Sequence, residues 1–259
     1  MSMTLPVQLS VQVDGGEPQV LSLQGPAGPA ALVLEGDAPL STLRLQVLQG
    51  QWRWHALQWP LPAAARLQLD VFAYPGATVA GWRQTDSAYP SLWWDGLDYD
   101  LVVLAFGTNE GNVQPFDAQA YERMLRSAVS VWRARFAPSA CVLIGPGDRG
   151  VLVRRGGKTG AARKAARAHA PKVDLLRYTR IHAEINRLQQ QVAAQHGCRF
   201  WSMQQAMGGA GSAYRWQARQ PALMARDLIH FTVPGYQQLA RQFAADMGWQ
   251  PALVEGAAP

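Results

Sequence analysis

The sequence predicts an α/β fold, a doubly wound parallel sheet with helices on both faces, preceded by a small β-sandwich-like segment. Two observations support this prediction. Residues 1–68 contain short runs of alternating apolar and polar residues and no helix signal. From residue 67 onward, apolar runs of strand length alternate with amphipathic segments of helix length. That order is typical of βα units, which bury a parallel sheet between two layers of helices.

The first 68 residues are predicted to form short antiparallel strands joined by turns. Apolar and polar residues alternate in 8–13 (QLSVQV), 43–48 (LRLQVL) and 51–57. Between these runs stand DGG, GPAGP, EGD and LQG, which are typical turn compositions. We therefore expect residues 1–68 to be a β-rich segment distinct from an α/β domain at 69–259.

In the α/β part, the strands are predicted from apolar runs and the helices from amphipathic segments with cap or stop residues. The strand candidates are the apolar runs at 67–75, 101–107, 140–146 and 198–202. The helix candidates are 117–136, 178–196 and 234–247, which carry an Asp cap, a Gly stop and an initial Pro respectively. Ligands of such sheets bind at the carboxyl ends of the strands, so the residues that follow each strand are the site candidates.

Three short motifs stand at such positions. Gly76 follows the first run, and without a side chain it can present its backbone N–H to an oxyanion. Asn109 follows the second run in GTNEGN and can donate its amide to the same oxyanion. Asp227 lies three residues before His230 in DLIH, a spacing that lets a carboxylate orient an imidazole as a base. Each motif alone is a weak signal.

Together and in this order, the motifs resemble those of the SGNH (GDSL-like) hydrolases, whose sheet is of flavodoxin-like type. The resemblance covers residues 67–249. Finer features resemble the bacterial peptidoglycan O-acetylesterase branch; they are PGATVAGW, DLVVLAFGTNEGN, VLIGPGD, CRFWSMQQAMGGAGS and DLIHFTVPGYQQLA. In that branch a carbohydrate-binding-like β-sandwich is inserted after the first catalytic block, and residues 1–68 resemble part of such a module.

The resemblance implies a serine esterase that removes O-acetyl groups from a cell-wall polysaccharide through an acetyl-enzyme. His230 is then the base, Asp227 its orienting partner, and Gly76 with Asn109 the oxyanion hole. The expected substrate is acetylated polysaccharide or a small acetyl ester, with no cofactor and no metal. The resemblance also implies a periplasmic or extracytoplasmic location. The opening residues lack a signal-peptide pattern, which leaves a cytoplasmic location open.

The family's first block, a strand ending in Gly-Asp-Ser, is missing from the sequence. The serine strand is expected mainly from a segment upstream of Met1 or from another chain. A second interpretation is a degenerate block at 31–38, with alanine in the serine position, and a third is a displaced nucleophile at Ser41. Ser87 and Ser91 are expected in loops. The nucleophile is thus unknown, and the alternative function is a catalytically inactive SGNH-fold glycan-binding protein.

The charge of the chain is concentrated in one segment. The formal net charge is +6, and residues 149–180 contain ten Lys or Arg and one acid, which gives +9 and leaves −3 for the rest. This pattern favours a basic insert with a solvated surface over a nucleic-acid-binding fold, since no DNA- or RNA-binding motif is present. No apolar run of membrane-spanning length occurs, so we expect no membrane span.

Some buried and exposed positions are also predicted. Cys141 and Cys198 lie in apolar runs and are expected to be free thiols in the core. Trp216 is expected to line the cleft together with Trp93 and Trp94. His182 and His196, on one predicted helix, are expected to be at the surface or partly buried.

Overall fold

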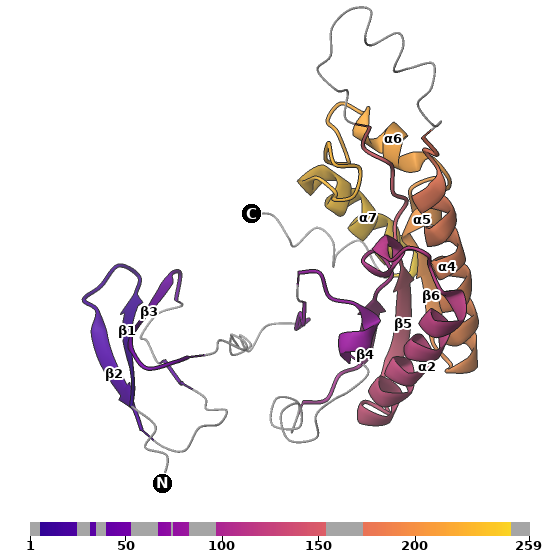
Figure 1. Cartoon of the computed structure of the whole chain (residues 1–259). Coiled ribbons are helices and arrows are strands. Elements are labelled where there is room, and N and C mark those ends of the chain that lie inside the picture. The colour runs from indigo at the N-terminus through magenta and orange to yellow at the C-terminus, as the bar shows by residue number, and fades with distance from the viewer. Residues whose placement is uncertain are drawn as a thin grey trace, which may run out of the picture. The chain divides into compact units, whose positions relative to one another are not determined.

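Figure 1 shows the computed structural model of the chain. It describes residues 6–24, 32–34, 40–52, 67–73, 75–82, 97–153 and 173–249. The chain divides into two compact units, residues 1–72 with 91–93, and residues 73–90 with 94–259. The described strands form one three-stranded sheet in each unit.

The sheet of the first unit is antiparallel, with strand order β2-β1-β3. Its strands are β1 (Val7–Val13), β2 (Gln19–Leu23) and β3 (Leu43–Gln49). Leu9 and Val11 of the central strand are buried, as alternation along a half-buried strand requires. The strands expected at 8–13 and 43–48 are confirmed, β2 was not predicted, and most of the run at 51–57 lies outside the described residues.

The sheet of the second unit is parallel, with order β4-β5-β6. Its strands are β4 (Leu101–Ala105), β5 (Ala140–Gly145) and β6 (Arg199–Ser202). They confirm the strands predicted at 101–107, 140–146 and 198–202, and with the helices they confirm the α/β class.

The three predicted long helices are also present. They are α2 (Ala118–Arg135), α4 (Arg177–Gln195) and α7 (Val233–Asp246). Asp117 caps α2 by accepting from the Ala120 amide, and Thr232 caps α7 by accepting from the Gly235 amide. Shorter helical segments that were not predicted are η1 (Val79–Trp82), η2 (Glu110–Asn112), α5 (Met203–Ala206) and α6 (Ser212–Gln217).

Helices cover both faces of the parallel sheet. Phe200 and Trp201 are neighbours in β6, so their side chains point to opposite faces. Phe200 lies beside Gly145 together with Asn186 of α4, whereas the Trp201 ring meets Phe243 of α7 with centroids 5.1 Å apart. The sheet is therefore doubly wound, with α4 and α7 on opposite faces (Figure 1).

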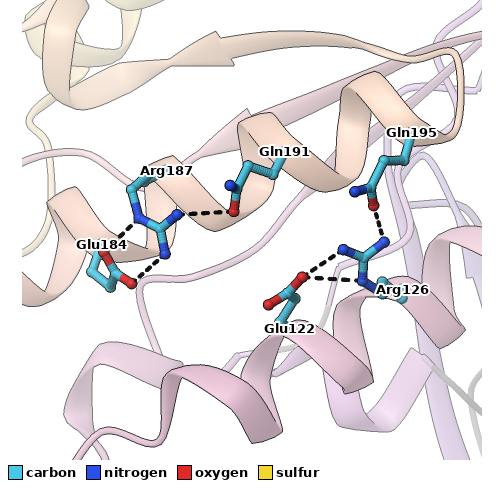
Figure 2. Close-up of polar contacts among 6 residues, drawn as sticks. All are labelled: Glu122, Arg126, Glu184, Arg187, Gln191 and Gln195. Atoms are coloured by element: carbon cyan, nitrogen blue, oxygen red, sulfur yellow. Dashed lines mark hydrogen bonds and ion pairs between the residues drawn. The ribbon is translucent and has the colours of Figure 1, made fainter.

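A polar network joins α2 and α4 at the protein surface (Figure 2). Arg126 of α2 pairs with Glu122 one turn away and donates to Gln195 of α4. On α4, Arg187 bonds Glu184 and Gln191. Exposed pairs of this kind stabilise a protein by less than about 1 kcal/mol each. Among these contacts, the bond between Arg126 and Gln195 crosses between the two helices.

The strand predicted at 67–75 is absent from the described part of that run. Residues 67–73 form no strand, and the Leu69 side chain is 78% exposed. In the 2-1-3-4-5 order that the resemblance implies, this run would pair with the first strand of the sheet and not with β4. The block that carries the first strand is missing from the sequence, so this run has no neighbouring strand with which to pair.

The two cysteines form a disulfide, so the expectation of free thiols is wrong. The register pairs Val142 of β5 with Arg199 of β6, which places Cys141 and Cys198 opposite each other one residue earlier. Each cysteine lies in an apolar run as expected. The sequence alone did not show that the two runs are adjacent parallel strands in this register.

Trp216 was expected in the cleft but lies in the core. It is 3% exposed, and its Nε1 donates to the Met207 carbonyl over 2.9 Å. It packs in a buried cluster that includes Trp201 and Leu239. Trp93 and Trp94 lie outside the described residues. None of the described helices combines the length and apolarity that crossing a membrane requires.

Candidate active site

The turn that follows β4 lies directly on helix α4. A side chain at Gly107 would place its Cβ 2.7 Å from Ile185 Cγ2, and one at Gly111 would lie 2.5 Å from His182 Nε2. Gly107 also has a φ of 116°, a conformation that favours glycine. The two glycines therefore let the backbone between them approach the helix, which fixes the position of Asn109.

Glu110 connects this turn to the segment that contains Gly76. Its carboxylate is buried, with the residue 6% exposed. Oε1 accepts from the Val79 amide at 2.7 Å and Oε2 from the Gly107 amide at 3.0 Å. Hydrogen bonds to an ionised acceptor are stronger than neutral ones. In the sequence, Glu110 appears only as part of the GTNEGN motif. The one local sign of its role is that it is an acidic residue inside a turn bounded by glycines.

The structure brings the two residues predicted for the oxyanion hole together. The Asn109 amide nitrogen donates to the carbonyl oxygen of Ala77 over 2.8 Å, and Ala77 directly follows Gly76. Gly76 has a φ of 76°, and a Cβ added there would meet nothing within 4 Å. Its N–H has no acceptor among the described residues. The second amide hydrogen of Asn109 and the Gly76 N–H can therefore both donate to an oxygen of another molecule.

Asp227 and His230 form the predicted pair. His230 Nδ1 lies 2.7 Å from Asp227 Oδ2, and the other carboxylate oxygen accepts from the amides of Ile229 and His230. The carboxylate requires a hydrogen on Nδ1, so the neutral ring has its lone pair on Nε2. The His230 side chain is 71% exposed. The ring is therefore oriented by Asp227 and largely open to solvent.

The surroundings of Asp227 favour its ionised form. Burial acts to raise the pKa of this carboxyl group, but hydrogen bonds from the His230 ring and from the amides of His230 and Ile229 outweigh it. The pKa of Asp227 is consequently below its usual range. A carboxylate that stays ionised also stabilises the imidazolium that forms when His230 accepts a proton.

The turn that carries Asp227 and His230 is held by two neighbouring segments. Ala225 donates to the His230 carbonyl at 2.8 Å, and Met224 forms a β-bridge with Phe231. The Gly150 amide, in the loop after β5, donates to the Leu228 carbonyl at 3.0 Å. Leu228 has a φ of 61°, which is uncommon for a residue other than glycine. The turn is therefore fixed by the scaffold and not by its own sequence alone.

His182 of α4 packs against the same region, and it is fully buried, not at the surface or partly buried as expected. It is 1% exposed, and its Nδ1 lies 2.7 Å from the Gly147 carbonyl. Burial lowers the pKa of His182, and Nε2 is buried against Gly111 without a hydrogen-bond partner. Nδ1 must carry the hydrogen that bonds the carbonyl, and burial together with the unpartnered Nε2 favours the neutral ring. His182 thus contacts the loops after β4 and β5.

A second buried carboxylate fixes the loop after β5. Asp148 accepts from the Gln204 side chain at 3.1 Å and from the Ala213 amide at 3.0 Å. These bonds attach the loop to α5 and to the start of α6. Like Glu110, Asp148 was not predicted as a functional residue, because its partners come from segments that only the fold brings together.

The candidate nucleophiles fall in the other compact unit or outside the described residues. Ser41 belongs to the first unit, where its amide donates to Asp14 at 2.8 Å. Most of the degenerate block at 31–38 lies outside the described residues, as do Ser87 and Ser91. No hydroxyl group in the described ranges bonds His230 Nε2. In the same part of the chain, no cluster of His, Cys, Asp or Glu could hold a metal ion.

The chain is similar to several solved structures. A solved peptidoglycan O-acetylesterase is 26% identical, with a TM-score of 0.49 over 70% of this chain and 45% of its own. An acetylxylan esterase from Geobacillus stearothermophilus is 19% identical, with a TM-score of 0.43 over 68% of this chain and 69% of its own. A lipase/acylhydrolase from Enterococcus faecalis is 17% identical, with a TM-score of 0.41 over 66% of this chain and 71% of its own. This chain thus spans less than half the length of the first of these.

No curated protein matches the sequence. The profile of one protein family does, and it aligns with residues 41–238, which include all four predicted site residues. The expected resemblance to SGNH (GDSL-like) hydrolases is confirmed at the level of the family. The chain belongs to the GDSL-like lipase/acylhydrolase family.

Proposed function

We propose that this chain carries the base and the oxyanion hole of an SGNH-type serine esterase that removes O-acetyl groups from peptidoglycan. The observation that carries the proposal is the orientation of His230 by Asp227 together with the convergence of Asn109 and the Gly76 segment. His230 Nε2 takes a proton from a serine, and the amides stabilise the oxyanion formed when that serine attacks an acetyl ester. The bond from the acetyl carbon to the sugar oxygen breaks, and the sugar hydroxyl leaves with the proton from His230. Water, deprotonated by the same histidine, then hydrolyses the acetyl-enzyme to acetate and free serine.

The serine is proposed to come from a strand outside residues 1–259. Gly-Asp-Ser does not occur in the sequence. Among the described strands, β4 pairs only with β5, so its other edge is open to a further strand. Val103 of β4 is 40% exposed at the middle of that strand. A parallel strand added at this edge would bring its carboxyl end to the same side as Asn109.

The disulfide supports an extracytoplasmic location. Disulfides such as Cys141–Cys198 persist in oxidising compartments and are rare in the cytosol. Peptidoglycan lies in such a compartment. We therefore propose a periplasmic or otherwise extracytoplasmic protein, with residues 1–68 acting as part of a carbohydrate-binding-like module.

The proposal is tested by acetate release from O-acetylated peptidoglycan. The chain itself and an in-frame version extended upstream to a Gly-Asp-Ser strand are compared, each with wild-type His230 and with His230→Ala. The extended wild-type protein is expected to release acetate and its His230→Ala variant to lose this activity. An inactive extended protein, or an active His230→Ala variant, contradicts the proposal.

The second candidate is a glycan-binding protein without catalysis, favoured by the lack of an assigned nucleophile. It predicts retained binding to peptidoglycan and no acetate release from either version of the chain. Sedimentation with purified peptidoglycan, with Asn109→Ala as the weakened variant, measures this. Failure to co-sediment removes the second candidate.

A further inference from the structure

Residues 151–153 and 173–176, which belong to the basic segment of the chain, lie together against helix α6. Tyr214 of α6 holds both of them. Its hydroxyl accepts from the Val151 amide over 2.7 Å and donates to the Leu175 carbonyl over 2.9 Å. Because one oxygen atom takes part in both bonds, the two stretches are fixed side by side.

These two stretches carry five aliphatic side chains that are exposed, each between 41% and 54%. We call them the aliphatic patch; they are Leu152, Val153, Val173, Leu175 and Leu176. The acid among them, Asp174, is paired with Arg180. A single exposed apolar residue is ordinary, but several on adjoining segments indicate a surface that binds another molecule.

The residues that connect the two stretches have no large apolar side chain with which to cover the aliphatic patch. Residues 154–172 contain no Val, Leu, Ile, Met, Phe, Tyr or Trp, and their only apolar side chains are those of Ala and Pro. The same residues contain seven Lys or Arg and no Asp or Glu. This composition adds positive charge beside the patch and offers it no aliphatic partner.

The described residues at the patch are positively charged as well. Arg177 directly follows the patch in sequence, and Arg215 borders it. A Cβ added at Gly211 would lie 3.6 Å from Nη1 of Arg215 and 4.0 Å from Cδ2 of Leu176. Neither arginine forms an ion pair within the described ranges. Exposed aliphatic side chains and unpaired cations therefore occur at one place on the surface.

We propose that the aliphatic patch and the cations beside it dock the protein on the surface of an anionic phospholipid membrane. Such a surface presents negative headgroups over an apolar layer, so basic and aliphatic side chains both find a partner there. A soluble polyanion would pair with the cations only and would leave the aliphatic side chains in water. The docking is peripheral and needs no helix that crosses the bilayer. It does not rest on the proposed esterase activity.

The test is co-sedimentation of the 259-residue chain with lipid vesicles. One set is made of phosphatidylcholine alone, and the other of equal parts of phosphatidylcholine and the anionic phosphatidylglycerol. The chain is expected to bind the anionic vesicles at least about tenfold more tightly than the neutral ones, and this binding is expected to weaken as salt is added. Equal binding to the two sets, or binding to neither, overturns the proposal.

A pair of substitutions in the patch separates lipid binding from simple attraction between charges. Leu175→Ser with Leu176→Ser leaves every charge in place and is expected to weaken binding to anionic vesicles about tenfold. Binding to dextran sulfate, a soluble polyanion, is expected to be unchanged. The matched control is Leu67→Ser with Leu69→Ser, which removes two more exposed leucines from the first unit and is expected to bind vesicles like the wild type.

A second pair keeps the test valid if Leu176, which caps the start of α4, is needed for folding. Leu152→Ser with Val153→Ser makes the same kind of change on the other stretch and is expected to weaken vesicle binding similarly. Vesicle binding that neither patch pair weakens, or that the control pair weakens equally, disproves the role of the patch. Acetate release enters none of these measurements, so failure of the esterase proposal is distinguishable from failure of this one.

Discussion

The side-chain amide of Asn109 donates to the carbonyl oxygen of Ala77 over 2.8 Å, although 32 positions separate the two residues in sequence. Glu110, the next residue, binds the Val79 amide over 2.7 Å. Two neighbouring side chains thus attach the turn after β4 to the segment that contains Gly76. The oxyanion hole proposed here depends on this attachment, and the buried carboxylate of Glu110 is its main support.

Removing the Glu110 carboxylate is expected to destabilise the protein strongly. In Glu110→Ala the amides of Val79 and Gly107 lose their acceptor while staying buried, which costs about 2–4 kcal/mol of unfolding free energy. Urea denaturation measures the loss. Glu122→Ala, which removes a partly exposed carboxylate paired with Arg126, is the control and should cost less than about 1 kcal/mol. Similar losses in the two variants would show that Glu110 is not the main support.

Gly111 is expected to be intolerant of even a methyl group. Gly111→Ala places a Cβ 2.5 Å from Nε2 of the buried His182 ring, and that ring is fixed by its bond to Gly147. The resulting overpacking costs about 1–3 kcal/mol. Gly81→Ala is the control, because a Cβ there meets nothing within 4 Å. Equal thermal unfolding of the two variants would contradict the close contact with α4.

His182 is expected to make the protein less stable as pH falls below about 6.5. The unfolded chain binds a proton on this residue near pH 6.5, whereas burial lowers the pKa of His182 in the folded chain. Below pH 6.5 the unfolded state therefore holds more protons, and the stability present above that pH is lost as pH falls toward the folded pKa.

The measurement is the unfolding free energy as a function of pH in wild type and His182→Gln. The wild-type slope is expected to be steeper, by up to about 1.4 kcal/mol per pH unit. His196→Gln is the control, because burial also lowers the pKa of His196 but that residue is only partly buried. Parallel curves for wild type and His182→Gln would refute the prediction.

The Cys141–Cys198 disulfide is expected to leave no free thiol in the chain and to raise the unfolding free energy. The unfolded chain, alkylated without reductant, should carry no label, and after reduction it should carry two. Because the bond closes a loop across a sequence separation of 57, Cys141→Ala with Cys198→Ala is expected to lower the unfolding free energy by about 4 kcal/mol. Label on both cysteines before reduction, in protein from an oxidising compartment, would contradict the pairing.

The sequence was sufficient to predict those helices and strands whose signals lie within a few neighbouring residues. Asp117 marked the start of α2, and the apolar runs marked β4, β5 and β6, because capping and burial act over a few residues. Asp227 and His230 lie one turn apart, so their contact could also be expected from spacing.

What the sequence did not reveal depends on pairing between distant segments. The Cys141–Cys198 bond requires the register of β5 and β6, and burial of Trp216 requires the packing of α6. The run at 67–73 has the alternation of a strand but no neighbouring strand, so the local pattern alone predicted an element that the sheet does not contain.

The central claim is that Asp227 and His230 activate a serine opposite the Asn109 oxyanion site. The most direct measurement is the hydrolysis rate of an aryl acetate by the upstream-extended protein and its variants. His230→Ala is expected to lose at least about 10³-fold in kcat/KM, and Asn109→Ala about 10²- to 10³-fold. Gln238→Ala, a change on α7 outside the site, should leave the rate unchanged. A His230→Ala variant that hydrolyses the ester as fast as wild type would contradict the account.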